Sequence, residues 1–238
     1  MSKAVVYTGN VNEFQDNDVN EFQDHVTVAV GLVKIETGAF RNCKGLTNLS
    51  FLEGSAVTTV GHWAFERSGL ITLVGMEDVR KIGKCAFYMC KGLRTIEGLG
   101  CDEMGEACFT LCRLLQSMKG WPASMTVIPG ACFYHCTGMT TVDCDLSHVT
   151  SIGVSTAGNH AFVGCTSLLP HSLSAGNADP AAVLAFLKRK SFLEQRAPER
   201  RAFLCSLKHA KSDFYNRTGD PCGASRRIIM EFAGLFPA

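Results

Sequence analysis

The chain has 238 residues, of which 46% are hydrophobic and 19% are charged, so it can bury a core and lacks the composition of a disordered protein. Its 23 basic and 22 acidic side chains give a net charge of +1, which excludes a strong overall attraction to nucleic acid or membrane. The charge is uneven, because residues 175–238 hold 11 Lys and Arg against 6 Asp and Glu, leaving 12 against 16 in residues 1–174.

Residues 1–25 are polar and acidic, and the string VNEFQD occurs twice, at 11–16 and 19–24. This character predicts an irregular N-terminal cap, partly disordered over the first ten residues, because the end of a repeat array must shield apolar side chains from water. The segment lacks the apolar run of a signal peptide, and the chain has no membrane-span-like run. We therefore expect a cytoplasmic protein, with the cell surface or secretion as the alternative.

From residue 26 to 174 one pattern recurs around a phenylalanine. Successive anchors are separated by 25, 22, 22, 24 and 29 residues, which is the period of a solenoid whose every turn is one repeat. One coil cannot bury its apolar side chains alone, so neighbouring coils must stack and the rings must form one ladder. The anchors are Phe40, Phe65, Phe87, Phe109, Phe133 and Phe162.

Each anchor lies between two short apolar segments. A small residue precedes it, and in all but the last repeat an aliphatic residue lies five positions before it, as with Ile82 before Phe87. A pair of the type Leu93-x-x-Ile96 follows it. Each coil thus supplies two short extended edges and an aromatic corner, and strands of successive coils would pair in parallel about 4.8 Å apart.

The string IGKCAFYMCKGLRTI, residues 82–96, closely resembles the BspA-type leucine-rich repeat, and the likeness covers about residues 26–170. The resemblance implies an α/β fold: a right-handed leucine-rich-repeat solenoid with a parallel β-strand ladder and short helical corners. It also implies recognition of proteins or surfaces and no catalytic residues. The sequence departs from the pattern at Ser68, Cys108 and Cys132, and an insertion at 153–160 is expected to distort the last repeat.

Five of the twelve cysteines lie three residues after an anchor: Cys43, Cys90, Cys112, Cys136 and Cys165. Stacking would bring adjacent thiols within disulfide reach, yet small buried thiols are common in cores, so we favour reduced packing over a disulfide ladder. A zinc site could be imagined from Cys132, His135 and Cys136 with Cys108 and Cys112. These residues coincide with repeat positions, so we expect no metal and no cofactor.

Catalytic motifs are missing from the sequence. It contains no G-x-S-x-G elbow, no Walker loop and no G-x-G-x-x-G, and its histidines bear no relation to a nucleophile motif. We therefore expect no enzyme.

Residues 175–238 predict a helical C-terminal cap. Asp179-Pro180 is a helix start, and further helices are expected near Pro198 and from about Ser225. The basic residues of this segment would face solvent or, alternatively, bind nucleic acid or anionic membrane. They are Lys188, Arg189, Lys190, Arg196, Arg200, Arg201, Arg226 and Arg227.

Polar side chains recur between the buried leucines, and strand alternation makes them neighbours on one surface. We expect this surface to bind an unidentified protein partner, and we expect the chain to be a monomer. An alternative is a structural or cell-surface adhesive module with oxidised cysteines, and a second is the basic adaptor in which residues 175–238 alone would bind. The candidate partner-binding residues are Arg94, Thr95, Glu97, Gln116, Ser117, Lys119, Thr141 and Asp143.

Overall fold

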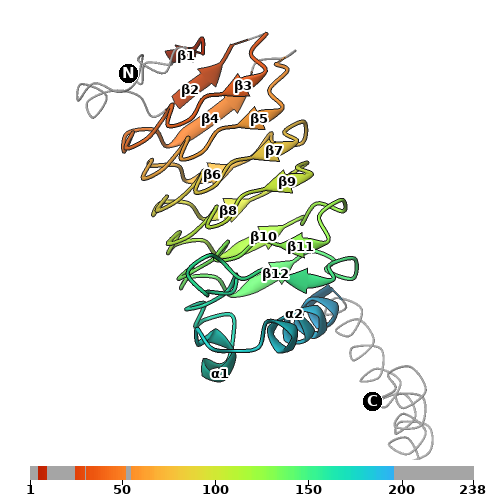
Figure 1. Cartoon of the computed structure of the whole chain (residues 1–238). Helices are drawn as coiled ribbons and strands as arrows, with labels where there is room; N and C mark the ends of the chain where they lie inside the picture. The colour runs from red at the N-terminus through yellow and green to blue at the C-terminus, as the bar shows by residue number, and fades with distance from the viewer. Residues whose placement is uncertain (1–4, 10–24, 30, 52–54, 196–238) are drawn as a thin grey trace, which may run out of the picture. The chain divides into compact units, whose positions relative to one another are not determined.

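Two short extended segments recur in every coil, where the aliphatic residues lie. The computed structural model describes residues 5–9, 25–29, 31–51 and 55–195. Figure 1 shows the coils stacked into a column, and the column with most of α2 forms one compact unit, Met1–Phe192. The strands are β1 (Val5–Tyr7), β2 (His25–Val28), β3 (Lys34–Ile35), β4 (Asn48–Phe51), β5 (Thr59–Val60), β6 (Thr72–Leu73), β7 (Lys81–Ile82), β8 (Thr95–Ile96), β9 (Glu103–Met104), β10 (Ser117–Lys119), β11 (Val127–Ile128), β12 (Thr141–Asp143) and β13 (Ser151–Ile152).

The strands form separate ladders along the column. One series contains the sheets β1-β2-β4 and β6-β8-β10-β12, and the other contains β3-β5-β7-β9 and β11-β13. Pairing between the named strands is parallel and keeps equivalent residues in register, as with Ile35, Val60 and Ile82. Because side chains alternate along a strand, the two-residue strands β3 and β7 bury their isoleucine and turn the preceding lysine outward. β9 differs, because its Met104 is only partly buried.

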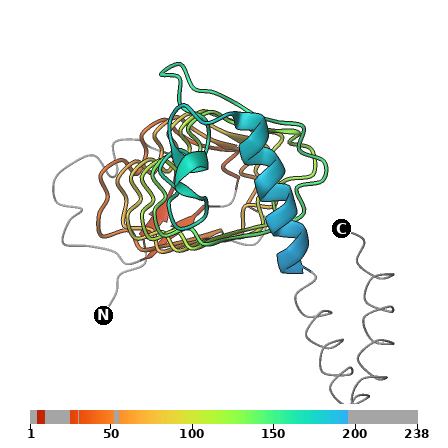
Figure 2. The ribbon, with the colours of Figure 1, turned by 90° about the horizontal axis from the view of Figure 1, so that it is seen from below.

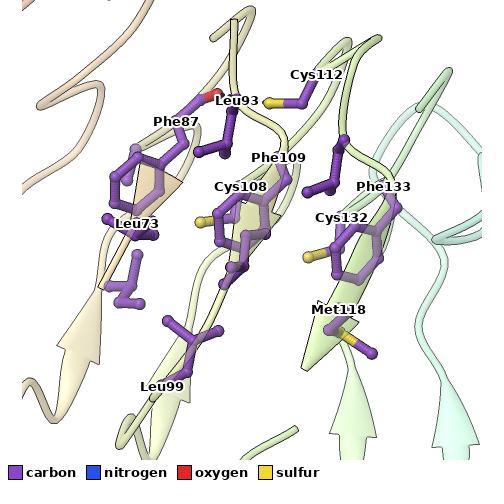
Figure 3. Packing of buried hydrophobic residues seen from close by; sticks show 14 of the residues in the cluster. Leu73, Phe87, Leu93, Leu99, Cys108, Phe109, Cys112, Met118, Cys132 and Phe133 are labelled. Carbon is purple, nitrogen blue, oxygen red and sulfur yellow. Dashed lines mark hydrogen bonds between the residues drawn. The ribbon is translucent and has the colours of Figure 1, made fainter. Parts of the chain in front are cut away.

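The six anchor phenylalanines form a single stack inside the column, and each is fully buried. Ring centroids of successive coils lie 5.1, 5.2, 5.2, 5.6 and 5.2 Å apart, with interplanar angles between 2° and 19°. Figure 3 shows Phe87, Phe109 and Phe133 face to face. Centroid separations in this range are favourable for aromatic pairs, so the stack adds to the apolar burial of each ring.

The corners are made of turns, where we expected short helices. Alternate backbone N–H groups bond to the next coil, as when Phe87 donates to the Cys108 carbonyl at 2.9 Å and Met89 to that of Thr110 at 2.8 Å. The N–H groups between them bond within the turn, as when Tyr88 donates to the Cys85 carbonyl at 3.1 Å. A helix would use the same groups within one coil, so stacking excludes it. Positions two before and two after most anchors have positive φ, as at Asn42, Trp63, Arg67, Cys85, Met89, Ala107, Leu111, Ala131 and His135.

The N-terminal segment contains a strand where we expected irregular chain. Val5–Tyr7 forms β1 and pairs in parallel with β2. The Tyr7 ring is buried and packs on Phe40 with centroids 4.8 Å apart at 60°, so it closes the aromatic stack at this end. Residues 10–24, which include both VNEFQD strings, lie outside the described residues.

The insertion in the last repeat projects as a small hairpin, with Val154 and His160 forming an antiparallel bridge. Helices α1 (His171–Ser174) and α2 (Pro180–Gln195) follow, and the Asp179 carboxylate accepts a hydrogen bond from the Ala181 N–H at 3.0 Å. Figure 2 shows α2 crossing the end of the column. It contacts the last coils through Ser191, whose hydroxyl donates to the Cys144 carbonyl, and Lys188, whose Nζ lies 3.2 Å from the Ser147 carbonyl oxygen.

Only the first of the three expected C-terminal helices can be compared with the structure. The segments near Pro198 and from Ser225 lie outside the described residues, as do Arg196 and the basic residues after it. Of the basic residues in this segment, the structure describes Lys188, Arg189 and Lys190 on α2. The adaptor hypothesis for residues 175–238 therefore stays a prediction.

Candidate interaction surface

The eight candidate partner-binding residues lie together on β8, β10, β12 and the residues beside them. The ladder aligns Thr95, Ser117 and Thr141 in one row, because Ser117 pairs with both of the others. Lys119 pairs with Asp143 in a second row. Arg94 and Gln116 form a third row just before the strands, where the Gln116 N–H donates to the Arg94 carbonyl at 2.9 Å. We call this surface, including β6, the strand face.

Charges on the strand face are matched within it. Lys119 Nζ lies 2.7 Å from Glu97 Oε1, and both side chains are partly exposed. The hydrogen bond and negative charge of Glu97 raise the pKa of Lys119, with a smaller contribution from Asp143. An exposed pair of this kind adds little to stability, because water competes for both groups. These charges therefore remain available for an intermolecular contact.

Two apolar members of the strand face escaped the sequence prediction. Ile71 and Val74 flank β6, and their exposed fractions are 39% and 46%. Ile71 continues the row of Arg94, whose N–H donates to the Ile71 carbonyl at 2.8 Å. The sequence did contain the information needed to find them. Ile71 and Val74 occupy the same repeat positions as Arg94 and Glu97, as the alignment of residues 70–74 with residues 93–97 shows.

The cysteines that lie three residues after an anchor phenylalanine form a row of their own, which lies in the core. Thiols donate to the carbonyl oxygen of the phenylalanine one coil earlier: Cys90 to Phe65 at 3.0 Å, Cys112 to Phe87 at 3.3 Å, Cys136 to Phe109 at 3.1 Å and Cys165 to Phe133 at 3.0 Å. Among the described cysteines other than Cys43, the free thiols are those of Cys85, Cys90, Cys101, Cys108, Cys112, Cys132, Cys136, Cys144 and Cys165. Burial raises the pKa of Cys90 and of Cys165 to about 12 and that of Cys43 to about 11. These thiols are therefore packing residues with little thiolate at neutral pH.

The residues of the imagined zinc site point to separate partners. The Cys132 thiol lies 3.6 Å from the Met104 sulfur, and the Cys136 thiol donates to a backbone carbonyl. Among the described residues, no group of three or more His, Cys, Asp or Glu side chains has a metal-binding arrangement.

Ser68 stands where the other repeats have a cysteine, and the corner at this position is one residue shorter. Leu70 lies five positions after Phe65, whereas Leu93 lies six positions after Phe87. The Ser68 hydroxyl still lies 3.3 Å from the Cys90 sulfur, so it keeps its place in the row. Beside it a hollow of about 390 Å³ is lined by Lys44, Arg67, Ser68, Gly69, Met89, Lys91 and Gly92.

Comparison with known proteins agrees with the repeat. No curated protein matches the sequence. A leucine-rich repeat protein from Bacteroides ovatus is similar in structure, with 24% identity and a TM-score of 0.51, over 62% of this chain and 36% of that one. A leucine rich cell surface protein from Faecalibacterium prausnitzii gives 20% identity and a TM-score of 0.50, over 71% and 47%. This chain thus spans less than half the length of either.

No helix within the described ranges has the length and apolar character needed to cross a membrane.

The family model described as "BspA type Leucine rich repeat region" matches in six copies, over residues 14–140 and 59–175. These two ranges together cover well over half of the chain and contain all six anchor phenylalanines. The chain belongs to the BspA-type leucine-rich repeat family.

Proposed function

We propose that this protein is a non-catalytic scaffold that binds a protein partner through the strand face. The observation that carries the proposal is the alignment of exposed side chains in straight rows over β6, β8, β10 and β12. Backbone pairing fixes the spacing of these side chains before any partner arrives. Little backbone conformational entropy is therefore lost on binding, which favours affinity.

The composition of the face suits a protein partner better than nucleic acid. Exposed Ile71 adjoins Arg94 and exposed Val74 adjoins Glu97, and the charges of Lys119 and Glu97 offset each other. Protein interfaces combine apolar contacts, arginine and a polar rim in this way. Binding to nucleic acid would call for a continuous positive stripe to neutralise phosphates.

The test replaces Arg94, Glu97, Gln116 and Lys119 together with Ala. A partner captured from the native cell by the full chain should bind this variant at least about tenfold more weakly, since interface anchors each contribute on the order of 1 kcal/mol or more. The matched control replaces Lys34, Glu36, Thr59 and Ser151, which lie on the other ladder and include an exposed ion pair of 2.6 Å. Unchanged binding by the first variant would show that the face is wrong.

The thiols also bear on the compartment, and we infer a reducing one, the cytoplasm. Nine free thiols within the described residues, Cys43 not counted, are unusual for a secreted chain, in which neighbouring thiols tend to oxidise. The cell-surface description of the Faecalibacterium protein is the reason to test this location. Cell fractionation with an antibody to the chain distinguishes the two, and recovery of the chain in a secreted or surface fraction would reject the cytoplasm.

A further inference from the structure

The coil that contains Phe65 lacks one residue of its corner. The fourth position after the anchor is a lysine in the coils on either side, Lys44 and Lys91. The middle coil has Gly69 there and reaches its leucine one position sooner, so no side chain lies between the two lysines in this row. The hollow of about 390 Å³ opens at this place, and we call it the corner hollow.

The wall of the corner hollow is held by backbone bonds to the coils on both sides. The Arg67 N–H donates to the Tyr88 carbonyl at 2.8 Å, and the Gly69 N–H donates to the Cys43 carbonyl at 3.1 Å. A Cβ at Gly69 would collide with the Lys44 carbonyl oxygen, so this position stays without a side chain. The hollow is therefore a fixed feature of the folded chain and needs no ligand to form.

The corner hollow is positively charged. Three of its lining residues are cations and none is acidic. Lys44 and Lys91 are exposed, and within the described ranges neither has an ion-pair partner. The third cation is Arg67. Their charges are therefore available to an anion from solution.

Buried Glu66 holds the arginine of the corner hollow from behind. Its side chain is 6% exposed, with Arg41 Nε 2.7 Å from one carboxylate oxygen and Arg67 Nε 3.7 Å from the other. The charge of Arg41 offsets that of Glu66, so the positive charge of the hollow is not cancelled. Arg67 faces Glu66 through Nε, which leaves its terminal Nη nitrogens as donors for the oxygens of an anion.

We propose that the corner hollow binds a phosphate group. Lys44 and Lys91 lie two coils apart, roughly 10 Å between backbones at the usual spacing of paired strands, and two long flexible side chains can close that span on one anion. Arg67 lies on the coil between them. A phosphate monoester has a charge of about −1.5 to −2 at pH 7 and three acceptor oxygens, so it suits three cations better than a carboxylate does.

The experiment titrates the ¹⁵N-labelled full chain at neutral pH and constant ionic strength and follows the Gly69 and Gly92 amide signals by NMR. The probes are inorganic phosphate, phosphoserine with both ends blocked, and glutamate blocked in the same way. We expect saturable shifts with phosphate probes, at least about fivefold tighter than with glutamate, because a second charge is matched. Tighter binding of phosphoserine would identify a phosphorylated side chain as the source, and tighter or equal binding of inorganic phosphate would identify free phosphate.

A lysine pair tests the charges of the corner hollow. Lys44→Ala with Lys91→Ala should weaken phosphate binding by at least about tenfold, because each substitution removes a charge-assisted hydrogen bond. Both side chains are exposed, so the fold should be unaffected. The matched control, Lys34→Ala with Lys84→Ala, makes the same change in net charge on the other ladder and should alter binding by less than about twofold.

The decisive variant inserts one alanine between Ser68 and Gly69. It restores the spacing of the neighbouring corners and fills the hollow without changing the charge, so phosphate binding should be lost while the thermal midpoint is kept. None of the lining residues belongs to the strand face, so the result is independent of partner binding there. Absence of saturable binding by both phosphate probes, equal affinity for glutamate, or equal loss in the two lysine pairs would overturn the proposal, as would undiminished binding by the folded insertion variant.

Discussion

The anchor phenylalanines are the residues on which the column depends most. Each ring contacts the rings of adjacent coils, and Phe109 lies between Phe87 at 5.2 Å and Phe133 at 5.6 Å. Removing one ring leaves a cavity that neighbours cannot fill, because their backbones are fixed by pairing to further coils.

Phe109→Ala should lower the free energy of unfolding by about 3 to 5 kcal/mol, the cost of lost burial plus the cavity. Phe192→Ala is the control, because that ring is 53% exposed, and it should cost less than about 1 kcal/mol. Urea denaturation followed by circular dichroism measures both. Equal costs for the two substitutions would mean that the stack does not carry the stability.

At the scale of the element, the corner is stabilised by bonds between coils. Backbone N–H groups of the corner donate to the neighbouring coil, and the thiol row adds a parallel set of bonds to phenylalanine carbonyls. The geometry places residues other than glycine, such as Met89 and Leu111, at positive φ. That backbone conformation is strained for these residues, and the regular pairing between coils compensates for it.

The packing of the corner predicts which cysteine thiols an alkylating reagent can modify. In the native chain at pH 8, iodoacetamide should modify Cys85 first, since it is partly exposed, and should spare Cys112 and Cys136. Burial raises the pKa of all three, and well above the ordinary value for the two buried ones, so little thiolate forms at that pH. Mass spectrometry of digested chain gives the rates, with denatured chain as the reference. Equal rates for Cys85 and Cys112 in the native chain would contradict the packing described.

Across the whole molecule, each coil contacts its neighbours and stability is a sum of adjacent terms. Removing one complete coil should therefore leave the remaining coils in register. The separation of 22 residues from Phe87 to Phe109 defines such a coil, and deletion of residues 82–103 joins Lys81 directly to Met104.

The deletion of residues 82–103 should fold with the same circular dichroism spectrum per residue and with a lower urea midpoint and slope, because less surface is buried. Deletion of residues 82–92 alone is the control: it joins Lys81 to Leu93 and puts Gly98 at the anchor position of Phe87, so the coil loses its ring and the chain should not fold. A full-coil deletion that fails to fold would mean that the coils are not equivalent.

The sequence determined the repeat, because burial recurs with the period of the coil. The positions of the six phenylalanines, the inward aliphatic residues and the rows around Arg94 and Lys119 follow from that period alone. The start of α2 at Pro180 followed from local capping chemistry. Each of these features depends on residues that are near in sequence or strictly periodic.

The tertiary structure decided what depends on the neighbouring coil. Tyr7 closes the aromatic stack from a strand outside the regular spacing, so no period revealed it. The corners are turns because every second N–H group finds its partner in the next coil. The shorter corner at Ser68 can be read from the sequence, yet the hollow beside it appears only when the neighbouring coils place Lys44 and Lys91 around it. Pairing between coils is a long-range interaction, and single-sequence patterns do not record where it fails.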